Sequence, residues 1–456
     1  MSVPTAPRFF AKFQWLRAPL AFVVAAGVLG GWAPAARSED LSFEDARAAL
    51  VAKSDLIKAS EANINRQEFE VKASETLSYP ELTLNATQVY GRKNFDLSRL
   101  PIGVSTYDYN FDGPRSSLLM TWPIFTGGKV GAVQQLREAE LTGARAELLQ
   151  TEERLDFQLI ARYFGLRLAT IVEGLRRTQL EQAERQLVRS RRFEAQGQIS
   201  AVERLSAQVS RDEAARDMVK AQRERESAEA ALARMLRKSS TPRPSSPLFV
   251  ITSPIEPLAA WQREAELKNP TLALIKSKGQ AAEQGIAIAK SDYLPQVFAF
   301  GQYNLITTYL TPIEPNWIAG IGVNLKLFSR EDRASKVGAA QAQKAQVDAL
   351  EADAVNSIQS AVETAWLRLG QAREQFQLYD SAVELARENL RLRERAFEEG
   401  QSVTIDVNEA RNSLIRAETG RAQIAYEYVV ALGALLEASG QIGRFPDFMK
   451  RAEIQL

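Results

Sequence analysis

Four short stretches of the chain alternate between apolar residues and polar or small ones. They are residues 81–90, 116–125, 296–304 and 318–328. Alternation with a period of two is the pattern of a β-strand whose two faces meet different surroundings. Each stretch has about the length of a strand that crosses a membrane. The pattern therefore predicts four strands suited to a membrane, although a small soluble sheet packed on helices would share it.

The two faces of the predicted strands differ in chemistry. On the apolar face we expect Leu118, Met120, Trp122 and Ile124 in one strand and Ile321, Val323, Leu325 and Leu327 in another. On the opposite face we expect Thr83, Asn85, Asn324 and Lys326. In a membrane, the apolar face would contact lipid and the polar face would line a wet interior. Four strands cannot close a membrane barrel, whose known minimum is about eight, so several chains would have to contribute.

Two much longer stretches, residues 127–196 and 330–399, read as helices. A helix of about 70 residues is roughly 105 Å long, which no ordinary globular domain accommodates. Small side chains recur at helical spacing along both stretches, and such seams let helix backbones approach closely. The seams include Ala132, Ala139, Gly143 and Ala146 in the first helix and Ala342, Ala345, Ala349 and Ala352 in the second. We therefore predict an extended coiled or barrel-like array of helices.

The long helices belong to two copies of one pattern. The matching parts are 41–80 with 256–295, 121–125 with 324–328, Gly197 with Gly400, and Glu203 with Asp406. Each copy reads helix, strand, strand, very long helix, helix. We therefore divide the chain into a first repeat (37–238), a proline-rich linker (239–257), a second repeat (258–440) and a C-terminal tail (441–456).

The first 36 residues have the pattern of a secretory signal peptide. Arg8, Lys12 and Arg17 precede a short apolar run that ends in small residues around Ala36. Glycines interrupt the run, and it is short for a membrane span. We therefore expect residues 1–36 to direct export and then to be removed.

Composition removes most kinds of chemistry. The 456-residue chain carries 57 Lys and Arg against 56 Asp and Glu, so it has no net field that would attract nucleic acid. It has no Cys and no His, which removes thiolate chemistry, disulfides and the commonest general base and metal ligand. No phosphate-binding glycine loop or catalytic constellation is recognisable. We therefore expect no enzyme activity, no catalytic residue, no cofactor and no metal site.

Several motifs, taken in order, resemble those of the TolC-like outer-membrane efflux proteins. They are LSFEDARAAL, SYPELTL, WPIFTGGKV, SDYLPQV, VNLKLFSR and GQSVTIDVNEARNSL, and they span essentially the whole chain after the leader. The resemblance implies a mainly α fold with a membrane β-barrel. In this fold a homotrimer forms a 12-stranded barrel, with four strands per chain, and a long periplasmic α-helical barrel.

The resemblance also implies a function. It identifies an outer-membrane channel of a tripartite efflux or type I secretion system in a Gram-negative bacterium. The implied partners are outer-membrane lipid, a periplasmic adaptor protein and an inner-membrane transporter. The alternative interpretation of the residues is a periplasmic coiled-coil scaffold in which the strands form a small soluble sheet.

In this family, the stretch matching GQSVTIDVNEA lies at the periplasmic tip of the channel. Two acidic positions three residues apart form rings in the closed pore, and they fall on Asp406 and Glu409 here. Carboxylates gathered from three chains would give affinity for cations. Glu203, in the first copy, is a further gate candidate. A basic residue often found two positions after the glycine is Ser402 here, so an arginine latch is missing at that position.

The acidic pair also has the spacing of a capping box. In that interpretation Asp406 is the N-cap of a helix and Glu409 is its third helical residue. Ser200 and Glu203 offer the same box in the first copy. A cap and a gate are compatible roles for Asp406.

Glycines mark the turns that the pattern predicts. Glycine adopts left-handed backbone conformations without the steric cost that other residues meet. We expect Gly197 and Gly400 to form the turns at the ends of the long helices, and Gly127 and Gly128 to form the turn from a strand into its helix.

Overall fold

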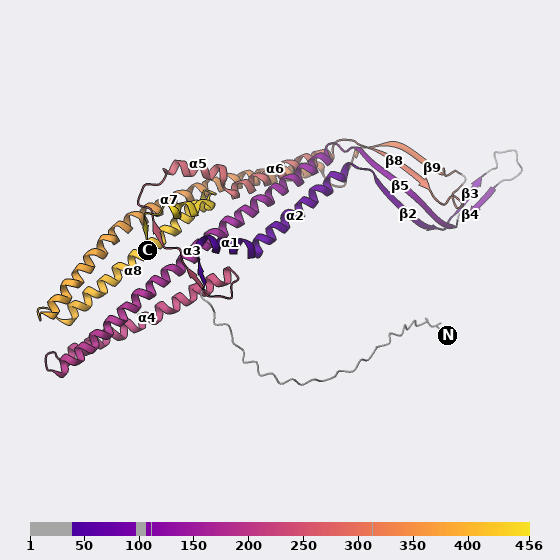
Figure 1. Cartoon of the computed structure of the whole chain (residues 1–456). Helices are drawn as coiled ribbons and strands as arrows, with labels where there is room; N and C mark the ends of the chain where they lie inside the picture. Colours follow the sequence, from indigo (N-terminus) through magenta and orange to yellow (C-terminus); the bar gives the residue numbers. More distant parts are fainter. Residues whose placement is uncertain (1–38, 97–105, 111, 312) are drawn as a thin grey trace, which may run out of the picture. The chain divides into compact units, whose positions relative to one another are not determined.

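The structure is a computed structural model and describes residues 39–96, 106–110, 112–311 and 313–456. The segment expected to be a signal peptide lies outside these residues. Helices dominate the described part of the chain (Figure 1). They are α1 (Phe43–Lys53), α2 (Asp55–Glu75), α3 (Lys129–Ala195), α4 (Ala201–Met235), α5 (Leu258–Lys268), α6 (Pro270–Ser291), α7 (Arg333–Glu398), α8 (Thr404–Ala438) and α9 (Phe445–Lys450).

The strands of the described residues form one four-stranded antiparallel sheet and several two-stranded pairs. The large sheet runs in the order β2 (Glu81–Val89), β5 (Gly113–Phe125), β8 (Gln296–Asn304) and β9 (Trp317–Asn324). The small pairs are β1 (Glu39–Leu41) with β6 (Pro242–Pro244), β3 (Arg92–Asp96) with β4 (Thr106–Asn110), and β7 (Phe249–Val250) with β10 (Ile454–Gln455). The sequence analysis did not predict the β3–β4 hairpin, whose two strands have only five residues each.

The two long helices, α3 and α7, contain 67 and 66 residues, close to the lengths expected from the sequence. The carboxylate of Asp332 caps the start of α7, because it accepts hydrogen bonds from the backbone N–H groups of Ala334 (3.2 Å) and Ser335 (3.0 Å). These two donors would otherwise have no partner in the first turn.

The long helices pack side by side in two successive rows (Figure 1). In the half nearer the sheet, the neighbours are α2, α3, α6 and α7 in that order, and in the other half they are α4, α3, α8 and α7. α3 and α7 run through both rows. In each row α7 lies at one edge, and α2 or α4 lies at the other.

The main hydrophobic core surrounds the middle of α3. The aromatic residues at its centre are Phe43, Tyr163, Phe164, Phe249 and Phe445, each at most 1% exposed. The Tyr163 hydroxyl donates to the carbonyl of Leu41 (2.6 Å) and accepts from the N–H of Ser246 (3.0 Å), so its polar group is satisfied in the core. This core joins the start of the first repeat to segments from the linker and the C-terminus.

The linker and the tail both contribute to this core. Residues 248–251 of the proline-rich linker are buried, and β6 of the same linker pairs with β1. In the tail, Phe445 and Phe448 are 1% exposed. Segments that the sequence showed only as a connector and a tail therefore help to hold the two repeats together.

Candidate functional site

The four-stranded sheet has one apolar face and one mainly polar face. Residues directly opposite each other in an antiparallel pair point to the same side of the sheet. By this register, the apolar face carries Leu82, Leu84, Leu118, Met120, Trp122, Ile321 and Val323, and the polar face carries Thr83, Asn85, Ser117, Gln302, Asn304 and Asn324. Ile321 is 71% exposed and Val323 is 68% exposed. The described residues therefore leave the apolar face uncovered.

Two details of the predicted faces are wrong. Strand β9 ends at Asn324, so Leu325, Lys326 and Leu327 lie beyond the paired residues. A register shift between Pro123 and Phe125 leaves Ile124 out of the ladder, and Phe125 takes its place opposite Val297. A bulge of one residue has this effect because strand side chains alternate with a period of two.

Two phenylalanines of β8 cover glycines of β9 on the polar face. A Cβ atom on Gly322 would lie 2.5 Å from the ring of Phe298, and one on Gly320 would lie 3.1 Å from the ring of Phe300. The glycines leave room for the two rings. Leu119 and Ile318 also lie on this face, opposite Thr83 and Gln302, so the face is mainly but not wholly polar.

The turn from β5 into α3 is formed by Gly127 and Gly128, as the sequence indicated. Both have left-handed backbones, with φ of 66° and 82°. A Cβ atom on Gly127 would lie 2.8 Å from Cβ of Leu294 and 3.0 Å from the carbonyl oxygen of Ser291. The turn therefore packs tightly against the junction between α6 and β8.

At their other ends, α3 and α7 finish in the same motif. Gly197 and Gly400 have φ of 70° and 73°. The N–H of Gln198 bonds to the carbonyl of Phe193, and the N–H of Gln401 to that of Ala396, which are the long hydrogen bonds of a Schellman motif. The structure therefore places both glycines in the turns where the sequence expected them.

The next helices start differently in the two copies. Ser200 is the N-cap of α4, and its hydroxyl accepts from the N–H of Glu203 at 3.4 Å. The N-cap of α8 is Val403, which makes no side-chain cap. The prediction that Asp406 is an N-cap with Glu409 as its partner is therefore wrong. Asp406 lies in the first turn of the helix, at the position that Glu203 holds in α4.

The two acidic gate candidates of α8 have different surroundings. The carboxylate of Asp406 accepts from the hydroxyl of Ser402 at 2.9 Å and forms an ion pair with Arg393 of α7 at 3.6 Å. Glu409 is exposed. Arg393 thus supplies a basic partner from the preceding helix, although position 402 carries none. A cation approaching this end of the chain would find the charge of Glu409 less neutralised than that of Asp406.

Ion pairs connect α3 to α4 and, in the second copy, α7 to α8. Those between α3 and α4 are Arg176–Asp217, Arg204–Glu194, Arg211–Glu184 and Arg225–Glu173. Those between α7 and α8 are Arg387–Glu418, Arg393–Asp406, Arg411–Glu394 and Arg421–Asp380. Neutral hydrogen bonds join the α3–α4 pair of helices to the α7–α8 pair. Asn408 donates to Ser210 at 3.2 Å, and Gln179 donates to Asn412 at 3.1 Å.

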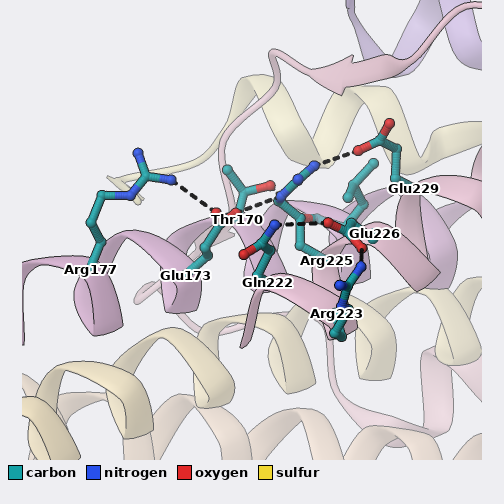
Figure 2. Close-up of polar contacts among 9 residues, drawn as sticks. Thr170, Glu173, Arg177, Gln222, Arg223, Arg225, Glu226 and Glu229 are labelled. Atoms are coloured by element: carbon teal, nitrogen blue, oxygen red, sulfur yellow. Dashed lines mark hydrogen bonds and ion pairs between the residues drawn. The ribbon is translucent and has the colours of Figure 1, made fainter. Parts of the chain in front are cut away.

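The most buried of these ion pairs centres on Glu173 (Figure 2). The Glu173 side chain is 10% exposed, and its two oxygens contact Arg177 of the same helix at 2.9 Å and Arg225 of α4 at 2.5 Å. Arg225 also pairs with Glu229. No sequence motif predicts this cluster, because Glu173 and Arg225 lie on different helices and are more than 40 residues apart in the chain.

A cavity of about 1040 Å³ lies among α3, α7, α8 and the start of α6. Glu153 of α3 and Glu437 of α8 both line it. Burial raises the pKa of Glu153 to about 8, and the negative charge of Glu437 contributes to this. Burial also raises the pKa of Glu437 to about 7, against the opposing effect of Arg154. No local motif joins Glu153 and Glu437, so the sequence did not reveal this pair.

The described residues show neither a metal cluster nor a membrane-spanning helix. No group of three or more carboxylates in this part of the chain is placed to hold a metal ion. None of the described helices is both long enough and apolar enough to cross a membrane.

Several known proteins resemble this chain in sequence or in fold. The outer membrane efflux protein BepC of Brucella suis is 23% identical over 394 residues, which cover 85% of this chain and 82% of BepC. Protein CyaE of Bordetella pertussis is 21% identical over 426 residues, covering 90% of this chain and 86% of CyaE. The CmeC outer membrane channel of Campylobacter jejuni superposes with a TM-score of 0.74 at 13% identity, covering 96% and 98% of the two chains.

The family model of the outer membrane efflux proteins matches both repeats, at residues 47–236 and 261–441. The chain therefore belongs to the outer membrane efflux protein family. It is an outer-membrane channel protein for efflux or secretion, and the scaffold alternative is not favoured.

Proposed function

We propose that three copies of this chain form one continuous channel, with a 12-stranded barrel in the outer membrane and a helical barrel in the periplasm. A periplasmic adaptor and an inner-membrane transporter would deliver the substrate, and residues 1–36 would direct export. The channel needs walls and a constriction but no catalytic group, and we expect no enzyme activity. The observation that carries the proposal is that the chain has two unpaired edges, one in the sheet and one in the row of helices. By the repeat, each edge is equivalent to a part of the chain that already has a partner within it.

The sheet supplies the first match. The first copy contributes β2 and β5 to the large sheet, and β5 pairs with β8, the first strand that the second copy contributes. The equivalent contact for the second copy would join β9 to β2 of another chain. In the described residues, both of these strands have a ladder partner on one side only. A head-to-tail ring would close both edges, and a membrane barrel requires such closure.

The helices supply the second match. In the first copy, the seam of α3 packs on α6 so closely that a Cβ atom on Gly143 would lie 2.7 Å from the Ser277 hydroxyl. The seam of α7, at Ala342, Ala345, Ala349 and Ala352, is exposed. Since α2 corresponds to α6 in the repeat, the α7 seam fits α2 of a neighbouring chain. By the same correspondence, α3 packs on α8 within the chain, so we expect α4 of the neighbour to pack on the half of α7 nearer its turn into α8.

Replacing Ala349 by Glu should prevent the ring from forming while leaving each chain folded. Ala349 is exposed in the single chain, whereas a carboxylate at a close helix contact would be buried without a partner. We expect the purified variant to lose the trimer mass by light scattering in detergent and to lose channel conductance in planar bilayers. Ala259→Glu, at an exposed position of α5, is the matched control and should stay trimeric. A conducting Ala349→Glu trimer would contradict the proposed contact.

We further propose that the turn between α7 and α8 forms the periplasmic constriction. The three-fold assembly would bring Asp406 and Glu409 of each chain around one axis, with Glu203 from the first copy nearby. The internal ion pairs support movement of α7 and α8 as a unit, because charged pairs hold the two helices together while the hydrogen bonds to the other pair are neutral. Opening would then require the loss of contacts such as Asn408–Ser210.

Replacing Glu409 by Gln should weaken block of the channel by a divalent cation added on the periplasmic side, by about tenfold. Asp406→Asn should have a smaller effect, because Arg393 and Ser402 already hold the Asp406 carboxylate. Block is measured from single-channel currents at several Ca²⁺ concentrations. Glu398→Gln, an exposed position before the turn, is the control. Equal block in the wild-type and Glu409→Gln channels would rule out a carboxylate ring at Glu409.

A further inference from the structure

The cavity among α3, α7 and α8 has a defined position on the helical wall. Ser357, Thr364 and Arg368 of α7 line it. Other residues of α7 contact α5 and the chain before it, since Gln359 donates to Glu266 (2.7 Å) and Trp366 donates to the carbonyl of Glu256 (3.2 Å). The cavity therefore opens on a different face of α7 from the one that α5 covers. In the proposed channel, we assign α5 to the outer side of the helical wall, so the cavity face of α7 is turned toward the bore.

The lining of the cavity combines apolar surface with carboxyl groups. Its apolar part includes Phe157, Ala365, Val430, Ala431 and Ala434. Glu153 and Glu437 are both partly buried. Oxygen Oε2 of Glu153 is buried and accepts no hydrogen bond from the described residues. A buried carboxyl oxygen without a donor is costly, so the site favours a ligand that can supply positive charge or a proton.

The charged groups around Glu153 come from three helices. They are Glu152, Arg154 and Asp156 of α3, Arg368 of α7, and Glu427 and Glu437 of α8. Arg154, Arg368 and Glu427 are exposed, whereas Glu153 and Glu437 are the partly buried members of the lining. The interior of the cavity is therefore acidic, and its basic groups lie where water screens them.

We propose that this cavity binds amphiphilic organic cations, with the apolar body against Phe157 and Val430 and the positive group between Glu153 and Glu437. Its volume of about 1040 Å³ suits a ligand of drug size. Binding at this position would hold such a cation against the wall of the channel during export. That role in export rests on the proposed channel function, whereas binding itself does not.

Binding should depend on pH with a defined sign. Glu153 and Glu437 have pKa values raised to about 8 and about 7, so both are largely protonated at pH 6 and ionised at pH 9. Ionised carboxylates attract a cation and neutral carboxyls do not, so affinity should rise across this interval. An ethidium ion keeps its charge throughout and is a suitable probe.

The experiment measures ethidium binding to the purified full-length protein in non-ionic detergent, by fluorescence polarisation at pH 6 and pH 9. We expect wild-type affinity to be about tenfold higher at pH 9, and the Glu153→Gln/Glu437→Gln variant to lose that gain. Glu374→Gln/Glu384→Gln, which changes two exposed α7 residues outside the cavity, should bind as the wild type does. Melting curves establish that each variant is folded.

Three results would overturn the proposal. They are pH-independent binding to the wild type, unchanged binding to the Glu153→Gln/Glu437→Gln variant, and equal affinity for an anilinonaphthalene sulfonate of similar size. The first and third need no variant, so they decide the question even if the double substitution fails to fold. Conductance of the same preparation tests the channel separately, and a conducting protein that fails to bind ethidium would contradict only the cavity proposal.

Discussion

Replacing Gly440 by Ala should lower the stability of the protein by about 3 kcal/mol. Gly440 follows α8 with φ of 69°, which costs other residues about 1 kcal/mol. A Cβ atom there would also lie 2.5 Å from the carbonyl oxygen of Lys268 and 2.9 Å from the nitrogen of Asn269. Both are backbone atoms at the junction of α5 and α6, so they cannot rotate away, and overpacking of this kind costs about 1–3 kcal/mol more.

The matched control for this substitution is Gly400→Ala. Gly400 has nearly the same backbone, with φ of 73°, but a Cβ atom there would meet nothing within 4 Å. It should therefore cost only about 1 kcal/mol. Thermal unfolding followed by far-ultraviolet circular dichroism in detergent compares the two variants. Equal losses would show that the contact with Lys268 and Asn269 does not constrain Gly440.

Replacing Glu173 by Ala should also destabilise the protein by about 3 kcal/mol, because it removes one member of a buried ion pair. Arg225 would keep Glu229 but lose its contact with α3. The same unfolding measurement applies, with Glu388→Ala as the control. Glu388 pairs with Arg391 on the exposed surface of α7, where water screens the charges, so its loss should change stability little.

Glu173→Gln separates charge from packing at this site. Gln keeps nearly the same shape but carries no charge, so it cannot form an ion pair with the guanidinium groups of Arg177 and Arg225. If the charge matters, Glu173→Gln should lose a large part of the stability that Glu173→Ala loses. A loss no larger than that of the Glu388→Ala control would contradict the role assigned to the buried pair.

The elements most open to prediction were those with a strong local signal. Alternation located the strands of the large sheet because each strand has one face that differs from the other. The glycines at 127, 128, 197 and 400 marked turns because their backbones have positive φ. The local signal failed at Ile124, where one extra residue in β5 changes the register and moves a neighbour to the expected face.

The repeat did not reveal how equivalent positions differ in the fold. Gly440 corresponds to Arg237, which adopts a left-handed backbone with φ of 50° and pairs with Asp55. Glu173 corresponds to Phe376, which is 1% exposed and has Arg421 over its ring at 5.3 Å. One copy thus fills this position with an ion pair and the other with an aromatic ring. A pattern alignment shows that the positions correspond but not which partners surround them.

The candidate gate shows the same limit. The spacing of Asp406 and Glu409 fits both a helix cap and a ring of charge, and the sequence left both open. The structure rejects the cap because α8 begins at Thr404, two residues before Asp406. It also brings Arg393 to Asp406 from the preceding helix, a contact that no local spacing predicts.

The sequence by itself located the strands of the large sheet and the two long helices, and it indicated membership of an outer-membrane channel family, but it missed the β3–β4 hairpin and the division of each predicted first helix into two, α1 with α2 and α5 with α6. Its successes follow from periodicity and motifs, which depend on residues near one another in the chain. Only the tertiary structure decided which carboxylates are paired, where Glu153 and Glu437 meet, and which seam is buried. Those outcomes depend on distances between helices that are far apart in the sequence. The physical reason is that burial and ion pairing are properties of packed neighbours, whereas helix and strand patterns are properties of the local chain.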